Sequence, residues 1–175
     1  MKKIALFLLF ALPLSVFAQD LKFGHIDRQE IIKVMPEYTV AQKTLEDLSL
    51  KYKEEISKLE TEFQTKYTDF QQNGATLEAT IKSSREAELQ RMYNNIQDFT
   101  SKAQDDLQAK QVDLMKTISD KLNKAIKEVG SENGFIYIFD VQGEANQEQV
   151  FSSVLYFSSK STDVLPLVKK KLNIK

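Results

Sequence analysis

Cysteine and tryptophan are absent from this 175-residue chain, which has one histidine, three prolines and five glycines. Without cysteine the chain has no disulfides, no thiol nucleophile and no lipidated cysteine of the kind that anchors bacterial lipoproteins. No nucleophile–base pair or cluster of metal ligands can be assembled from the remaining residues. We therefore expect no enzyme activity and no catalytic, metal or cofactor site, with the single histidine, His25, as a packed or partly exposed side chain.

A surplus of positive charge is also missing. Residues 19–175 carry 22 basic and 25 acidic side chains, which gives this part of the chain a net charge of −3. Nucleic-acid-binding domains usually present a clustered basic surface. The charge balance therefore argues against a nucleic-acid partner.

No apolar run is long enough to span a membrane comfortably, which takes about 20 residues. The apolar run over 4–17 is shorter than this, follows two lysines, and ends near Val16 and Ala18, small residues at the positions that signal peptidase recognises. We expect a signal peptide over 1–18, cleaved after Ala18, and export to the periplasm. The alternative is a retained membrane anchor.

Helix-breaking residues are nearly absent from the centre of the chain. The 93 residues between Pro36 and Gly130 contain no proline and a single glycine, Gly74. Each such residue would cost about 1 to 3 kcal/mol inside a helix. The sequence predicts two long helices over 36–129, folded back on each other at a tip within 73–84, where Asn73-Gly74 favours a turn and 82–86 could cap a restarting helix.

Apolar residues in both predicted helices recur with an 11-residue period, which gives a nearly straight stripe along a helix. A narrow stripe is buried by one partner helix and leaves the other faces in solvent. The period therefore predicts an antiparallel helical hairpin. The stripe comprises Leu45, Leu48, Tyr52, Ile56, Leu59, Phe63, Tyr67 and Phe70 in the first helix, and Ile96, Phe99, Ala103, Leu107, Leu114, Ile118, Ala125 and Val129 in the second.

The second stripe is interrupted by Lys110 and Lys121, so either the packing there is imperfect or the lysines extend outward to solvent. Towards its end the same helix gains a second stripe, which widens its apolar surface beyond what one partner helix can cover. This end should enter a core or an interface between subunits. The added residues are Val112, Met115, Leu122 and Ile126.

The flanking residues, 19–35 and 130–175, predict a small β-rich body. Residues 21–26 and 135–140 have the composition of short strands, 154–157 is a second apolar run, and Thr162-Asp163 can cap a final helix. A unit of this size is marginal alone, and its short strands would leave unpaired edges. We expect self-association through this body. The candidate body residues are Phe135, Ile136, Ile138, Val154, Leu155 and Tyr156, together with Val112, Met115, Leu122 and Ile126.

The order of these segments resembles the Skp/OmpH family of periplasmic chaperones over essentially the whole mature chain. The resemblance rests on residues 24–27 in the first strand, 35–38 at the start of the hairpin, 125–129 followed by 134–140, and 154–156 before the final helix. It implies an α+β, predominantly α protein that forms a homotrimer, with helical hairpins enclosing a cavity. It further implies an ATP-independent holdase for unfolded outer-membrane β-barrel proteins, with no catalytic residue to transfer.

One departure from the family concerns charge. Well-studied members are strongly basic, whereas residues 41–129 here carry 14 basic and 16 acidic side chains. Capture of clients, lipopolysaccharide or a membrane surface by positive charge is therefore not expected. The candidate client contacts are aromatic residues that either face the cavity or fill the hairpin seam: Phe63, Tyr67, Phe70, Tyr93 and Phe99. The alternative function is a structural coiled-coil spacer or adaptor in the periplasm.

Overall fold

The computed structural model describes residues 21–141, 154 and 156–174. The chain divides into two compact units. One consists of Met1–Ile31 with Asn123–Lys175 and contains the sheet; the other is Ile32–Leu122 and contains most of the two long helices. The predicted fold class, predominantly α with a small β-rich part, is confirmed.

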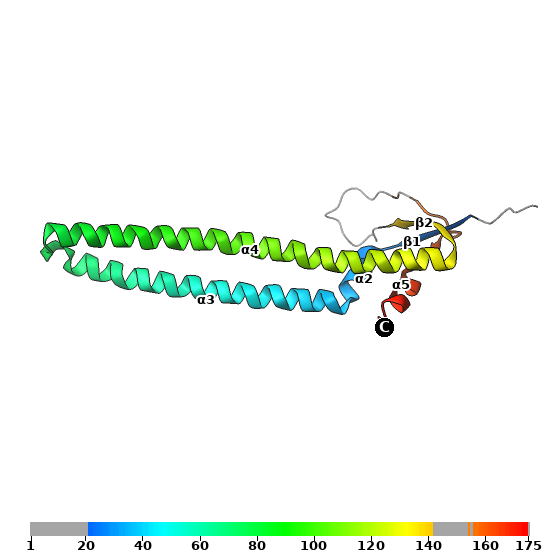
Figure 1. Ribbon diagram of the computed structural model, residues 1–175, viewed down its shortest axis with the longest axis horizontal. Coiled ribbons are helices and arrows are strands. Elements are labelled where there is room, and N and C mark those ends of the chain that lie inside the picture. The colour runs from blue at the N-terminus through cyan, green and yellow to red at the C-terminus, as the bar shows by residue number, and fades with distance from the viewer. Residues whose placement is uncertain (1–20, 142–153, 155, 175) are drawn as a thin grey trace, which may run out of the picture. The chain divides into compact units, whose positions relative to one another are not determined.

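Two long helices form the predicted hairpin. Helix α3 spans Pro36–Asn73 with 38 residues, and helix α4 spans Ala79–Asn133 with 55 residues. Figure 1 shows the two helices side by side and antiparallel, joined at the end that carries the short 3₁₀ helix η1, Gly74–Thr76. Pro36 occupies the first turn of α3, where its missing N–H costs nothing.

The reversal between the helices is short. After η1, Leu77 takes an extended conformation, and the Glu78 carbonyl already accepts the backbone N–H of Lys82 at 2.9 Å. The reversal lies within the predicted range 73–84. Of the two options there, the turn at Asn73-Gly74 is observed and the restart at 82–86 is not, because α4 has begun by Ala79. Gly74 is buried under the ring of Phe70, which would lie 3.2 Å from a Cβ added there.

The hairpin is held by a narrow apolar seam. The small or β-branched residues Ala41, Ile96, Ala103 and Ile118 are buried, while the larger residues of the α3 stripe are mostly half-buried. Lys110 and Lys121 extend outward, to Asp113 at 4.0 Å and to the Glu37 carboxylate respectively. Of the two alternatives predicted for Lys110 and Lys121, the structure therefore shows side chains that extend outward.

Polar contacts link the two helices beside the seam. The Tyr52 hydroxyl donates to Asp106 at 2.6 Å, and Lys66 contacts Glu88 at 2.5 Å. The hydrogen bond from Lys66 lowers the pKa of the Glu88 carboxyl, and the same contact raises the pKa of the Lys66 ammonium. Because folding depresses the pKa of the Glu88 carboxyl, this contact stabilises the hairpin fully at pH values above the ordinary pKa of glutamate. The stabilisation is lost as the pH falls from that value through the depressed pKa of Glu88.

The sheet is parallel throughout, with strand order β2-β1-β3. Strand β1 is Lys22–Ile26, β2 is Phe135–Asp140 and β3 is Thr162–Asp163. The first two strands match the predicted segments. The third strand does not lie in the apolar run 154–157, because Thr162 and Asp163 pair with Gly24 and His25 instead.

Short helices flank the strands. Helix α2 spans Arg28–Val34, and the Asp27 carboxylate caps it by accepting the N–H groups of Gln29 and Glu30 at 2.9 and 3.1 Å. Helix α5 spans Leu165–Lys171, and Asp163 accepts the Leu165 N–H at 2.9 Å. The start of α5 was predicted from Thr162-Asp163 in the sequence.

The glycine that ends α4 is Gly134, which has φ +69°, a conformation that favours glycine. Gly130, expected to end the helix, lies inside it. A Cβ at Gly130 would meet Ile138 Cδ1 at 3.4 Å, so the sheet packs closely on this turn of the helix.

One face of the sheet carries the core of its unit. Ile26, Val129, Val164 and Val168 are almost fully buried. A Cβ added to Gly24 would lie 2.8 Å from Val164 Cγ1 and 3.2 Å from Ile138 Cγ1. Glycine at this position therefore allows β1 to approach the residues beneath it.

Gly24→Ala is expected to lower the free energy of unfolding of this unit by about 1 to 3 kcal/mol, because the buried Val164 must move to admit the methyl group. Urea unfolding of the two proteins measures the difference. The matched control is Gly130→Ala, which adds a methyl at ordinary contact distance within a helix and should be neutral or stabilising. Equal effects of the two substitutions would contradict this account.

Candidate self-association and client-binding surfaces

The second face of the sheet is apolar and exposed. We call it the open face and define it by Leu21, Phe23 and His25 on the β1 side and Tyr137 and Phe139 on β2. Alternate strand residues point to the same face. The Phe23 and Tyr137 rings stack at 6.3 Å, and the Tyr137 and Phe139 rings stack at 5.9 Å. Leu21, Phe23, Tyr137 and Phe139 are 38–64% exposed.

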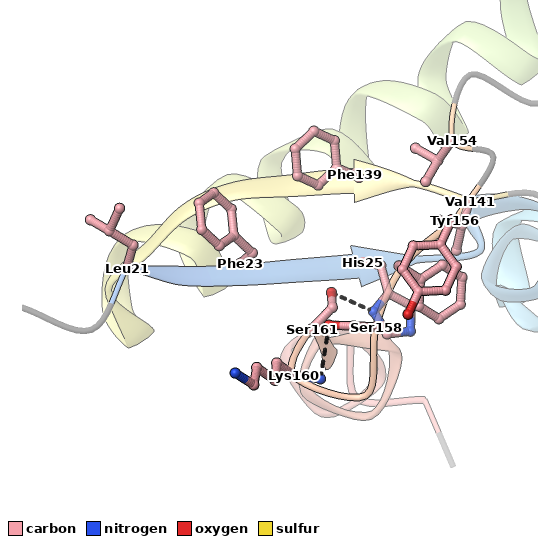
Figure 2. Close-up of a pocket in the computed structure, with 11 residues that line it drawn as sticks. Leu21, Phe23, His25, Phe139, Val141, Val154, Tyr156, Ser158, Lys160 and Ser161 are labelled. Carbon is pink, nitrogen blue, oxygen red and sulfur yellow. Dashed lines mark hydrogen bonds between the residues drawn. The ribbon is translucent and has the colours of Figure 1, made fainter.

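A groove of about 800 Å³ runs along the open face (Figure 2). Figure 2 shows Phe23 and Phe139 on neighbouring strands, with Val154, Tyr156 and the segment around Ser161 beyond them. Lys160 is the one charged side chain among the described residues that line it. The lining residues are Leu21, Phe23, His25, Phe139, Val141, Val154, Tyr156, Phe157, Ser158, Lys160 and Ser161.

An apolar surface of this kind is uncommon on a protein that works as a single chain. Monomeric proteins rarely expose contiguous apolar patches beyond a few hundred Å², and larger ones mark interaction sites. Tyr156 is 81% exposed and Phe157 is 48% exposed, so aromatic area continues from the strands into this segment. The face has the composition of the buried centre of a protein–protein interface, which is rich in aromatic residues and poor in charge.

The candidate body residues do not all gather on this face. Val154 and Tyr156 line the groove, whereas Phe135 and Ile138 lie on the packed face, within 3.3 Å of a Cβ at Gly24. Ile136 is 49% exposed outside the groove, and Leu155 lies outside the described residues. Sequence reasoning missed Leu21, Phe23, Tyr137 and Phe139. The alternation within 21–25 was available as a signal, whereas 135–139 is apolar at every position and does not distinguish the two faces.

The candidates on α4 differ in burial. Leu122 is fully buried within the chain, and Met115 and Ile126 are half-buried. Val112 is 62% exposed. Only Val112 therefore presents most of its side chain for contact with another molecule.

The hairpin carries a cluster of aromatic rings, which we call the aromatic cluster: Phe63, Tyr67 and Tyr93. Phe63 stacks on Tyr67 at 5.8 Å and lies 6.3 Å from Tyr93. Tyr67 is 41% exposed and Tyr93 is 50% exposed, although Tyr67 belongs to the predicted seam. The cluster offers rigid apolar area at the surface of the hairpin.

The other two aromatic candidates, Phe99 and Phe70, pack within the hairpin. Phe99 packs edge-on against Tyr52 at 6.0 Å, and Phe70 covers Gly74. Beside Tyr52, a shallow groove of about 370 Å³ lies between the helices, where Ala103 and its neighbours leave the seam incompletely filled. Its apolar lining residues are Tyr52, Ile56, Ala103 and Leu107.

No helix among the described residues is long and apolar enough to cross a membrane. Within the same part of the chain, no group of three or more histidine, aspartate or glutamate side chains is placed to hold a metal ion.

Comparison with known proteins places the chain among chaperone relatives. The model of the family "Outer membrane protein (OmpH-like)" matches residues 22–172. The chain is 27% identical over 138 residues to the chaperone protein Skp of Yersinia enterocolitica, an alignment that covers 77% of this chain and 82% of the relative. It is 26% identical over 139 residues, with the same coverage, to the chaperone protein Skp of Photorhabdus laumondii subsp. laumondii.

Proposed function

The chain belongs to the OmpH-like family of outer membrane proteins, and we propose that it is an ATP-independent periplasmic holdase that binds unfolded outer-membrane β-barrel proteins. The observation that carries the proposal is the family match over residues 22–172, which includes both the hairpin and the sheet. The two relatives named as Skp chaperones support a periplasmic chaperone role. The signal peptide over 1–18 would direct the chain there.

We assign self-association to the open face. The groove of about 800 Å³ and the exposed aromatic rings around it would lose their contact with water when another copy covers them. Burial of apolar surface contributes about 25 cal/mol per Å². A homotrimer, which the family resemblance implies, would bring several hairpins together around a shared space.

Client binding is assigned to the hairpins. Their exposed surface combines charged side chains of both signs with isolated apolar ones, among them Val40, Leu50 and the aromatic cluster. Each contact with a client would be weak. Several hairpins acting on one chain would raise the overall affinity through their effective concentration, without a single tight pocket. With 14 basic and 16 acidic residues over 41–129, this binding does not depend on net positive charge.

Light scattering after dilution of a urea-denatured outer-membrane β-barrel protein tests the holdase function. A threefold subunit excess of the mature protein, without nucleotide, should suppress most of the scattering, because the client's apolar segments are covered before they meet one another. Bovine serum albumin at the same mass concentration is the control.

Unchanged aggregation at that excess would overturn the holdase proposal. If the protein assembles but leaves aggregation unchanged, the alternative of a coiled-coil spacer or adaptor is the better account, since a spacer needs assembly and no client affinity.

A further inference from the structure

The middle of the hairpin carries the groove that the seam leaves incompletely filled. We call it the mid-hairpin groove and define it by its apolar residues Tyr52, Ile56, Ala103 and Leu107. Its volume of about 370 Å³ lies at the lower end of the range for ligand pockets, about 300–1,000 Å³. The groove can therefore receive a large apolar side chain. Polar lining residues can hydrogen-bond to the backbone beside such a side chain, and these are Ser49, Ser57, Thr100 and Gln104.

Charge is unevenly distributed along the hairpin. Residues 46–62 and 93–109, which together contain the whole lining of the groove, carry nine acidic and four basic side chains, a net charge of −5. The tip, 63–92, carries four of each sign, and the base, 36–45 with 110–122, carries three acidic and four basic side chains. We call 46–62 with 93–109 the acidic belt. The negative surplus of the hairpin is therefore concentrated around the mid-hairpin groove.

The acidic side chains of the belt are exposed, and more than half of them are unpaired. Four are engaged by Lys43, Lys58, Lys66 or the Tyr52 hydroxyl group. The other five make no ion pair within the part of the chain that the structure describes, and their charges are free to meet a ligand. They are Glu46, Glu54, Glu60, Asp98 and Asp105.

Glu60 has a special place among the unpaired residues. It lines the mid-hairpin groove together with one cation, Lys53, which lies seven residues or about 10 Å before it on α3. It also lines a second depression with Ser57 and Phe63, and Phe63 belongs to the aromatic cluster. A client segment that runs along α3 would therefore pass an unpaired carboxylate between two apolar contacts.

We propose that the mid-hairpin groove binds client segments that carry a lysine or arginine two residues away from a large apolar side chain. Residues two apart lie on the same face of an extended chain, so the apolar side chain can enter the groove while the basic one faces the acidic belt. The Debye length at physiological salt is about 8 Å, close to the width of a helix, so the whole belt contributes. The inference rests on the proposed holdase function and adds a preference for cationic segments to it.

Two dye-labelled peptides test the preference. Both alternate serine with larger residues and contain two phenylalanines, each flanked at two-residue spacing by lysine in one peptide and by glutamate in the other. Fluorescence anisotropy with the mature protein at low salt should show at least about tenfold tighter binding of the lysine peptide. The difference should shrink at about 0.3 M NaCl, because salt screens exposed charges.

Glu60→Lys should weaken binding of the lysine peptide by about fivefold, since it removes one exposed attraction and adds a repulsion. The matched control is Glu86→Lys, which makes the same change at an exposed position in the balanced tip. Glu86 likewise makes no ion pair with the residues that the structure describes. Equal effects of the two substitutions would count against the acidic belt as the binding site.

A photoreactive benzoylphenylalanine in place of one phenylalanine of the lysine peptide locates the site without altering the protein. Crosslinks mapped by mass spectrometry should fall within 49–60 and 100–107. Equal affinity of the two peptides, no binding of the lysine peptide, or crosslinks confined to the open face or to 63–92 would overturn the inference while the denatured β-barrel protein is still kept soluble. If that client also aggregates unchanged, the proposed holdase function itself fails.

Discussion

Phe139→Glu is expected to leave the protein monomeric at concentrations where the unaltered protein assembles. Phe139 lies in the centre of the open face, stacked on Tyr137, and it lines the groove. Placing a carboxylate in a covered apolar interface costs several kcal/mol unless it is paired, so association should weaken by at least about 100-fold. Sedimentation velocity on the mature protein measures the effect.

The substitution should not unfold the chain, because Phe139 is already 43% exposed. Ile81→Glu is the matched control: Ile81 is 48% exposed on the hairpin, so the same change there should not alter the sedimentation coefficient. Normal assembly of Phe139→Glu would show that the open face is not where subunits meet.

The double substitution Tyr67→Ser with Tyr93→Ser is expected to weaken client binding by about tenfold, since aromatic contacts contribute about 0.5–1.5 kcal/mol each. Both side chains are about half exposed beside Phe63, so their loss removes accessible aromatic surface and little of the seam. Fluorescence anisotropy of a dye-labelled, urea-denatured β-barrel protein, titrated with the variant, measures the affinity.

The matched control removes exposed aliphatic surface from the same hairpin. Val40→Ser with Leu50→Ser changes two residues that are 63% and 52% exposed and lie outside the aromatic cluster. This pair should weaken binding less than the tyrosine pair. Equal losses would mean that the hairpin binds through its general apolar surface and that the cluster has no special role.

The hairpin could be predicted because local rules determine it. The lack of proline and glycine between Pro36 and Gly130 left only the position of the tip open, and an 11-residue period fixed the seam. The cap at Asp163 could be predicted for the same reason, since its carboxylate accepts the N–H group of Leu165, only two residues further along the chain.

The sheet was harder to predict because its partners are far apart in sequence. Thr162 and Asp163 were expected to cap a helix, and Asp163 does so, yet both also pair with a strand almost 140 residues earlier. The open face depends on the same long-range pairing: Phe23 and Tyr137 stack only because β1 and β2 lie side by side. Nothing within either segment reveals the neighbour.

The end of the second helix was also difficult to predict from the sequence. Gly130 was expected to follow the end of the second helix, but Gly134 ends it, and the difference between the two glycines lies in tertiary packing. Gly130 stays in the helix where Ile138 packs against it, and Gly134 takes the positive φ that ends α4. A helix boundary between two glycines could not be set without knowing where β2 lies.

The mass of the complex formed with a client tests the central claim most directly. Light scattering coupled to size-exclusion chromatography, applied to the mature protein mixed with a urea-denatured outer-membrane β-barrel protein, gives that mass. We predict one soluble species that contains a single client chain and several copies of this protein, three if the assembly is a trimer. A client recovered only as aggregate, with the protein eluting unchanged and free of it, would contradict the account.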